Sequence, residues 1–251
     1  MLKFLTLLSR EVKSYFLSPT AYIVLCFFLL VTGFNFYIDI SLLSRGPTST
    51  TLLEAFFNSV PFWIGFILIF PPITMRVFSE EFKLGTIETL MTAPVSDWQV
   101  VLSKFGGALI FYILIWLPSL FYFVLFERIA GVQAANAAGA YVGSYLILLL
   151  IGMFFIAVGC LASVLTQNQI VAAVISFCII TLFFFAGILT FFTPNISPVF
   201  QEIVSYFSTL EHMGEFSKGI IDSRRIVFYG SATFFVLMLT LQIFQYRRWR
   251  A

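Results

Sequence analysis

Long uncharged stretches alternate with short charged segments along this chain, and that alternation is its clearest pattern. Four of the uncharged stretches, each about 20 residues long, cover 20–38, 55–75, 105–126 and 226–246. An α-helix of about 20 residues crosses a hydrocarbon core of roughly 30 Å at 1.5 Å per residue. Each of these stretches therefore predicts one transmembrane helix.

A fifth stretch, Ile129 to Phe200, is also uncharged and is long enough for two crossings. The polar sequence "TQNQ" at 166–169 is the natural place for a turn between them. We therefore predict helices over 140–165 and 170–192, which brings the total to six.

Composition agrees with a membrane location. Of the 251 residues, 60% are hydrophobic and only 10% are charged, and the mean hydropathy is +1.00. A soluble domain has about 25% charged residues. The predicted fold is a single all-α integral membrane domain over 1–251 with six transmembrane helices.

The distribution of Lys and Arg predicts the orientation. Six crossings place both termini on one side, and this side holds nine of the fourteen basic residues. They are Lys3, Arg10, Lys13, Arg76, Lys83, Lys104, Arg247, Arg248 and Arg250. Because cytoplasmic loops carry the excess of Lys and Arg, we expect cytoplasmic termini and a cytoplasmic segment at 76–104.

The N-terminal segment 1–18 is predicted to be an interfacial helix. Apolar residues such as Leu5, Leu8 and Val12 share one helical face, and cations such as Arg10 and Lys13 share the other. Such a helix lies along the membrane surface with its cations near lipid phosphates. The alternative is a simple basic anchor.

Two segments are predicted on the outer side. Residues 39–59 have the composition of an ordinary loop. Residues 193–225 are longer and more apolar, with Ser197 and Pro198 placed as a helix N-cap and first helical position. We predict one or two short helices there, before the sixth span, with a plain loop as the alternative.

Catalytic and metal-binding patterns are absent from the sequence. There is one histidine, His212, and we interpret it with Glu211 and Glu215 as a solvated surface cluster. The three cysteines have no metal-ligand spacing. None of the predicted spans contains an ionisable residue of the kind that proton- or ion-coupled carriers use.

The cytoplasmic segment 76–104 holds much of the acidic charge. Read as one helix, it places Leu84, Ile87 and Met91 on an apolar stripe that packs against the spans. A second, cytoplasm-facing stripe then contains Glu81, Gly85, Glu88 and Thr92.

Pro94 ends this helix, and a second helix follows at once. Ser96 and Gln99 form a capping box, with Val95 and Val100 as a hydrophobic staple. The segment is therefore either a helix that only covers the interface or a lever that carries a partner's motion to the spans.

The sequence "EEFKLGTIETLMTAPVSDWQVVLSK" resembles the signature of permease subunits of type 2 ABC exporters. The matching positions are Glu80, Glu81, Gly85, Thr86, Glu88, Leu90, Pro94 and Lys104. "FSKGIIDSRRIVFY" resembles the stretch before that family's last span, through Gly219, Asp222 and Tyr229. Within the family the chain looks closest to the gliding-motility-associated and copper-site maturation permeases.

The resemblance implies a non-catalytic subunit of the bacterial inner membrane. It would form an export pathway with a second permease, identical or paralogous, and bind a separate ATPase that carries ATP and Mg²⁺. The chain itself would hold no cofactor and bind no nucleic acid. The implied ATPase-docking residues, on a coupling helix between spans 2 and 3, are Glu80, Glu81, Gly85, Thr86, Glu88, Pro94 and Ser96.

Two other readings remain open at this point: a membrane scaffold or assembly subunit that moves no solute, and a carrier or channel independent of ATP. The sequence does not identify the substrate. The glycines of the fourth span suggest close helix packing, within one chain or between two permeases; they are Gly139, Gly143, Gly152 and Gly159.

Overall fold

The computed structural model describes residues 2–46, 49–87, 95–131, 133–135, 138–192 and 204–248, and these residues form helices and connecting turns without a strand. The helices are α1 (Leu2–Leu17), α2 (Pro19–Leu43), α3 (Leu52–Asn58), α4 (Val60–Thr74), α5 (Ser79–Leu84), α7 (Asp97–Ala130), α8 (Ala138–Leu165), α9 (Gln169–Phe192), α11 (Thr209–Ser217) and α12 (Ser223–Arg248).

Five helical stretches within the described residues are long and apolar enough to cross a membrane. They are Pro19–Leu43, Val60–Leu84, Asp97–Ala130, Ala138–Leu165 and Ser223–Arg247. The described apolar part of α9, Gln169–Phe185, is shorter. The prediction of an all-helical membrane protein is therefore confirmed, whereas the sixth crossing stays a prediction.

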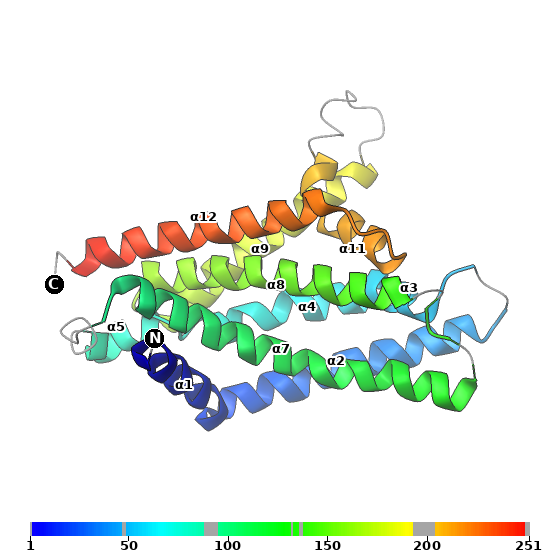
Figure 1. Cartoon of the computed structure of the whole chain (residues 1–251), viewed down its shortest axis with the longest axis horizontal. Helices are drawn as coiled ribbons and strands as arrows, with labels where there is room; N and C mark the ends of the chain where they lie inside the picture. Colours follow the sequence, from blue (N-terminus) through cyan, green and yellow to red (C-terminus); the bar gives the residue numbers. More distant parts are fainter. Residues whose placement is uncertain are drawn as a thin grey trace.

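The long helices run side by side in an elongated bundle (Figure 1). Helices α1 and α5 and the C-terminal end of α12 lie at one end, and α3 and α11 lie at the other. We call these the α5 end and the α11 end. Helix α8 is central, since it packs against α12, α9, α11, α4 and α7.

Close approach of backbones explains the glycines of α8. A Cβ on Gly143 would lie 2.5 Å from the backbone oxygen of Phe216 in α11, and one on Gly152 would overlap the ring of Tyr112 in α7. A Cβ on Gly159 would overlap Thr74 at the end of α4. These three glycines therefore serve packing within the chain, which answers the question left open by the sequence.

An aromatic cluster fills the interior between α3, α4 and α7. Phe57, Phe62 and Trp116 are buried, and the rings of Phe57 and Phe62 meet edge to face with centroids 5.3 Å apart. Phe66 stacks on Phe62 at 5.6 Å. Edge-to-face and offset ring pairs add stability beyond area burial alone, so these aromatic residues contribute directly to the core.

The prediction that 39–59 is an ordinary loop is wrong. Helix α2 continues to Leu43, and α3 buries Phe56 and Phe57 completely. The span 55–75 was predicted as one helix, but the structure has a break in it at Ser59. The hydroxyl of Ser59 caps α4 by accepting from the Phe62 N–H. Pro61 in the first turn also favours a helix start here, because an N–H at that position would have no intrahelical partner.

Candidate functional site

An ion-pair network joins α1, α5 and α7 at the α5 end. Lys104 Nζ of α7 lies 2.9 Å from Glu81 of α5 and 3.4 Å from Glu11 of α1. Arg10 of α1 completes the network, 2.9 Å from Glu11 and 3.2 Å from Glu81. The Lys104 side chain is only 2% exposed, so its two carboxylate partners are what make its burial tolerable.

Hydrogen bonds fix the chain just before α5 to the centre of the bundle. The Ser163 hydroxyl of α8 accepts from the backbone N–H groups of Phe78 and Ser79, at 3.0 and 3.1 Å. It also donates to the carbonyl of Met75 at 3.1 Å. One buried hydroxyl thus satisfies three backbone groups at the bend between α4 and α5, where no helical partner is available.

Contacts with α1 and α12 fasten the same segment from two further sides. The Tyr15 hydroxyl donates to the Ile73 carbonyl at 2.9 Å, and Arg76 donates to the Ser18 hydroxyl at 2.9 Å. The guanidinium of Arg247, on α12, lies 4.8 Å from the centre of the Phe82 ring. The start of the 76–104 segment is therefore held by four helices: α1, α7, α8 and α12.

The single helix predicted through Glu81, Gly85, Glu88 and Thr92 is wrong, because α5 ends at Leu84. Gly85 has φ +69°, a left-handed conformation that terminates a helix and that glycine adopts without strain. The chain turns there, so Glu81 does not share a cytoplasm-facing stripe with Gly85. Its carboxylate points instead to Arg10 and Lys104.

The turn leaves an exposed tip at the α5 end, formed by Lys83, Leu84, Gly85 and Thr86. Leu84, predicted on the packed apolar stripe, is 65% exposed, whereas Ile87 is buried as predicted. Glu80 is half-buried beside the tip. Two further predicted docking residues, Glu88 and Pro94, lie outside the described residues.

Ser96 begins α7 with the capping box expected from the sequence. Its hydroxyl accepts from the Gln99 N–H, and the Gln99 side chain accepts from the Ser96 N–H. Ser96 is exposed, and the helix that it caps runs without interruption to Ala130. A firmly capped helix start transmits a displacement along the helix axis better than a frayed one.

The second predicted motif lies at the α11 end and proves to be structural in its contacts. Gly219 has φ +84° and makes the turn after α11, packed against Ala140 at the start of α8. Asp222 caps α12 by accepting from the Arg224 N–H at 2.8 Å. Neither residue approaches the α5 end, so the two sequence motifs mark opposite ends of the bundle.

His212 is not a solvated surface residue, and that prediction is wrong. Its side chain is fully buried, and Nδ1 forms a 2.8 Å hydrogen bond with the hydroxyl of Tyr229 in α12. Burial, helped by the nearby Arg225 cation, lowers the pKa of His212 to about 3. The imidazole is therefore neutral at physiological pH and joins α11 to α12.

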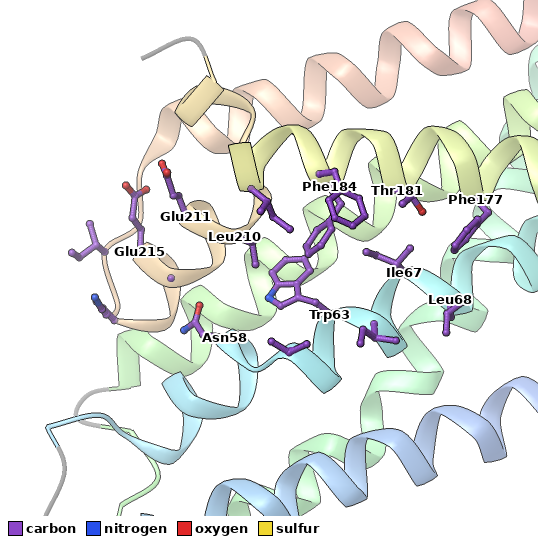
Figure 2. Close-up of a pocket in the computed structure, with 17 residues that line it drawn as sticks. Asn58, Trp63, Ile67, Leu68, Phe177, Thr181, Phe184, Leu210, Glu211 and Glu215 are labelled. Atoms are coloured by element: carbon purple, nitrogen blue, oxygen red, sulfur yellow. The ribbon is translucent and has the colours of Figure 1, made fainter. Parts of the chain in front are cut away.

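A groove of about 940 Å³ runs between α4 and α9 and has α11 at one end; sequence reasoning missed it. Figure 2 shows apolar side chains such as Trp63, Ile67, Phe177 and Phe184 along its length, with Glu211 and Glu215 at its α11 mouth. The helical spacing of Phe177, Thr181 and Phe184 hinted at one wall. Nothing in the sequence shows that α4 supplies the other.

The indole N–H of Trp63 and the hydroxyl of Thr181 are buried polar groups of residues that line the groove. Neither has a hydrogen-bond partner among the described residues, and Trp63 is 98% buried with its ring 5.3 Å from that of Phe184. An unpartnered buried N–H is costly. The groove therefore offers a few hydrogen-bonding groups, among them those of Trp63 and Thr181, within apolar walls, and carboxylates at its mouth.

Metal-binding groups of three or more His, Cys, Asp or Glu do not occur in the ranges that the structure covers. The two regions thus differ in character: the α5 end is a charged, multiply anchored segment with an exposed tip, and the groove is an apolar channel along the bundle. Together with the apolar helices, they belong to a multi-pass membrane protein.

The family model that matches the chain is that of the ABC-2 family transporter proteins, over residues 35–210. The match covers well over half of the sequence, and the chain belongs to this family. It is a membrane permease of an ABC transporter, a non-catalytic component that associates with an ATPase subunit. No curated protein matches the chain.

Proposed function

We propose that this chain is an exporter permease whose separate ATPase docks on the 76–104 segment. The tip of Lys83, Leu84, Gly85 and Thr86 would make the contact. Glu80 and Ser96 would contribute to the docking surface, and so would Glu88 and Pro94, which the proposal takes from the sequence alone. Exposed Leu84 gives the docking surface an apolar centre beside charged residues, and protein interfaces commonly have an apolar core with a polar rim.

The observation that carries the proposal is the anchoring of the segment directly behind that tip. Glu81 is one turn from the tip and forms ion pairs with Arg10 of α1 and Lys104 of α7. The backbone N–H groups of Phe78 and Ser79 donate hydrogen bonds to α8. A displacement of the tip by a closing ATPase dimer therefore reaches three helices without passing through a flexible joint. Chains of ion-paired and hydrogen-bonded groups of this kind can carry coupling between distant sites.

In this proposal α9 supplies the sixth crossing, and the α5 end faces the cytoplasm of a bacterial cell. The first helix and the end of α12 lie at the same end of the bundle (Figure 1), as an even number of crossings requires. A second permease, a copy or a paralogue, completes the pathway. The groove of α4 and α9 supports a cargo that has an apolar body and a polar end.

The proposal separates docking from coupling, and an ATPase assay of the reconstituted complex tests it. Glu81→Gln breaks the link to α1 and α7 behind the tip but leaves the tip itself unchanged. We expect this variant to bind the ATPase like the wild type and to lose most of the stimulation of ATP hydrolysis that the wild-type chain gives to the ATPase. Glu54→Gln, a carboxylate variant at the α11 end, is the control.

Normal stimulation in the Glu81→Gln complex would contradict the coupling path. Normal ATPase binding with no stimulation in any complex, the wild type included, would instead favour a scaffold subunit that transmits no motion.

A further inference from the structure

A second cavity, of about 650 Å³, lies at the α5 end where α1 turns into α2. We call it the corner cavity. One part of it is polar, with Lys13, Ser14 and Arg76 among its lining residues. The other part is apolar and includes Val24 and Phe111. The cavity therefore has the two-part character of an amphiphile's binding site.

The charges that line the corner cavity come from three helices and the bend after α4. They are Arg10, Glu11 and Lys13 of α1, Arg76 of the bend, Glu80 and Glu81 of α5, and Lys104 of α7. Arg10, Glu11, Glu81 and Lys104 neutralise one another in the ion-pair network. Two cations, Lys13 and Arg76, then face one carboxylate, Glu80, so the cavity keeps a positive excess.

Arg76 has hydrogen-bonding capacity left over for a ligand. One terminal nitrogen donates to the Ser18 hydroxyl, and the guanidinium, which lines the cavity, forms no ion pair with a carboxylate in the described part of the chain. A guanidinium presents its donors in a planar fork that suits phosphate oxygens. Lys13, exposed on α1 and without an ion pair among the described residues, adds a second cation to the same cavity.

The position of the cavity indicates which anion it meets. Helix α1 is amphipathic, and α2 begins at Pro19 as the first helix long and apolar enough to span a membrane. The corner between such helices lies at the depth of lipid headgroups. Basic pockets between helices at this depth bind anionic lipid headgroups, and the apolar part beside Val24 and Phe111 suits an acyl chain.

We infer that the corner cavity binds one anionic phospholipid, with its phosphate on Arg76 and Lys13 and an acyl chain along α2. The site joins α1 to the bend from which α5 starts. An effect of the lipid on ATP-driven coupling would rest on the proposed function, but binding itself does not. A binding assay on the isolated chain therefore tests the inference whether or not an ATPase docks.

The experiment is native mass spectrometry of the delipidated, full-length chain in detergent. Phosphatidylglycerol and phosphatidylcholine with identical acyl chains are titrated separately. We expect one phosphatidylglycerol to be retained at concentrations where phosphatidylcholine is not. Arg76→Gln should weaken this binding about tenfold, because it removes a charge-assisted donor. Arg45→Gln, an exposed arginine just beyond the far end of α2, is the matched control and should bind like the wild type.

Lys13→Gln is a second test that does not disturb packing, since Lys13 is exposed, and it should weaken binding several-fold. Equal retention of the two lipids, or wild-type binding by both Arg76→Gln and Lys13→Gln, would overturn the inference. Glycerol phosphate is added as a competitor. If it displaces the lipid at similar concentration, the site recognises a free phosphate and the lipid assignment is wrong.

Discussion

The two ends of the bundle hold the same long helices together by different chemistry. At the α5 end, four charged side chains link α1, α5 and α7. At the α11 end, a neutral His212–Tyr229 hydrogen bond and close packing of Gly143 on Phe216 link α11 to α12 and α8. The first arrangement is electrostatic and reaches solvent at Arg10, and the second is neutral and buried.

This difference suggests that the two ends of the bundle have different mobility during function. At the α5 end the tip and Arg10 reach solvent, so a partner can push on α5, and the ion pairs behind the tip pass the displacement to α1 and α7. At the α11 end, the buried His212–Tyr229 hydrogen bond and the close packing of Gly143 on the Phe216 backbone leave little room for displacement. We therefore expect the α5 end to move during function and the α11 end to act as the fixed reference.

The largest expected effect is at Lys104. Lys104→Ala leaves Glu81 and Glu11 without their shared buried cation, and it should lower the free energy of unfolding by about 3 kcal/mol. Thermal unfolding in detergent measures this. Lys83→Ala, an exposed lysine without an ion pair among the described residues, should change stability by less than about 0.5 kcal/mol.

The double variant Lys104→Ala, Glu81→Ala sharpens this test. If the network matters as a unit, the double variant should be more stable than the sum of the two single losses implies. Strict additivity would mean that Lys104 acts through packing and not through its carboxylate partners.

Gly143→Ala should have the next largest effect, a loss of about 2 kcal/mol. The added methyl group would meet the carbonyl oxygen of Phe216, which belongs to the backbone and cannot rotate away. Gly230→Ala in α12 is the matched control, because a Cβ at Gly230 has nothing within 4 Å. Equal melting temperatures for the two variants would show that α11 can shift to make room. That result would contradict the proposal that the α11 end stays fixed.

His212→Phe should cost about 1–2 kcal/mol, because it leaves the buried Tyr229 hydroxyl without its partner. Adding Tyr229→Phe removes the stranded hydroxyl, so the double variant should recover part of the loss. Denaturation of the three variants checks the cycle. A double variant less stable than either single variant would mean that the two rings stabilise by shape alone.

The same histidine gives the α11 end an acid sensitivity. The pKa of His212 is about 3 in the folded chain, against about 6.5 when unfolded. The unfolded state therefore takes up a proton first as the pH falls through 6.5, and stability is lost from there down to about pH 3. Between pH 7.5 and 5 this contributes about 2 kcal/mol. His212→Gln should show a correspondingly smaller loss over that interval when unfolding is followed at both pH values.

The features predicted correctly from the sequence are those that depend on residues close together in the chain. The uncharged stretches identified the long helices, and Ser96 with Gln99 identified the start of α7, because a capping box involves only residues three apart. Glycine favours the end of a helix, so the turn at Gly85 could also have been predicted from the sequence. The prediction instead continued the helix past Gly85 and was wrong there.

What the sequence could not show depends on contacts between distant segments. Glu81 looked like a surface residue because its partners, Arg10 and Lys104, lie far away along the chain. His212 looked solvated beside two glutamates because its burial depends on Tyr229 of α12. The groove likewise exists only because α4 and α9 lie side by side.

The central claim is that the exposed tip of the 76–104 segment binds an ATPase, and co-purification tests it most directly. The tagged chain is solubilised in mild detergent, and its partners are identified by mass spectrometry. Leu84→Asp places a charge on the exposed tip. Ile129→Asp, an exposed apolar residue near the other end of α7, is the matched control.

We predict that a subunit with a nucleotide-binding P-loop co-purifies stoichiometrically with the wild type and with Ile129→Asp, and is lost from Leu84→Asp while that variant remains folded. An ATPase that still binds the folded Leu84→Asp chain at full strength would contradict docking at this tip. The absence of any ATPase from the wild-type complex, even after gentle cross-linking, would contradict the coupling account as a whole.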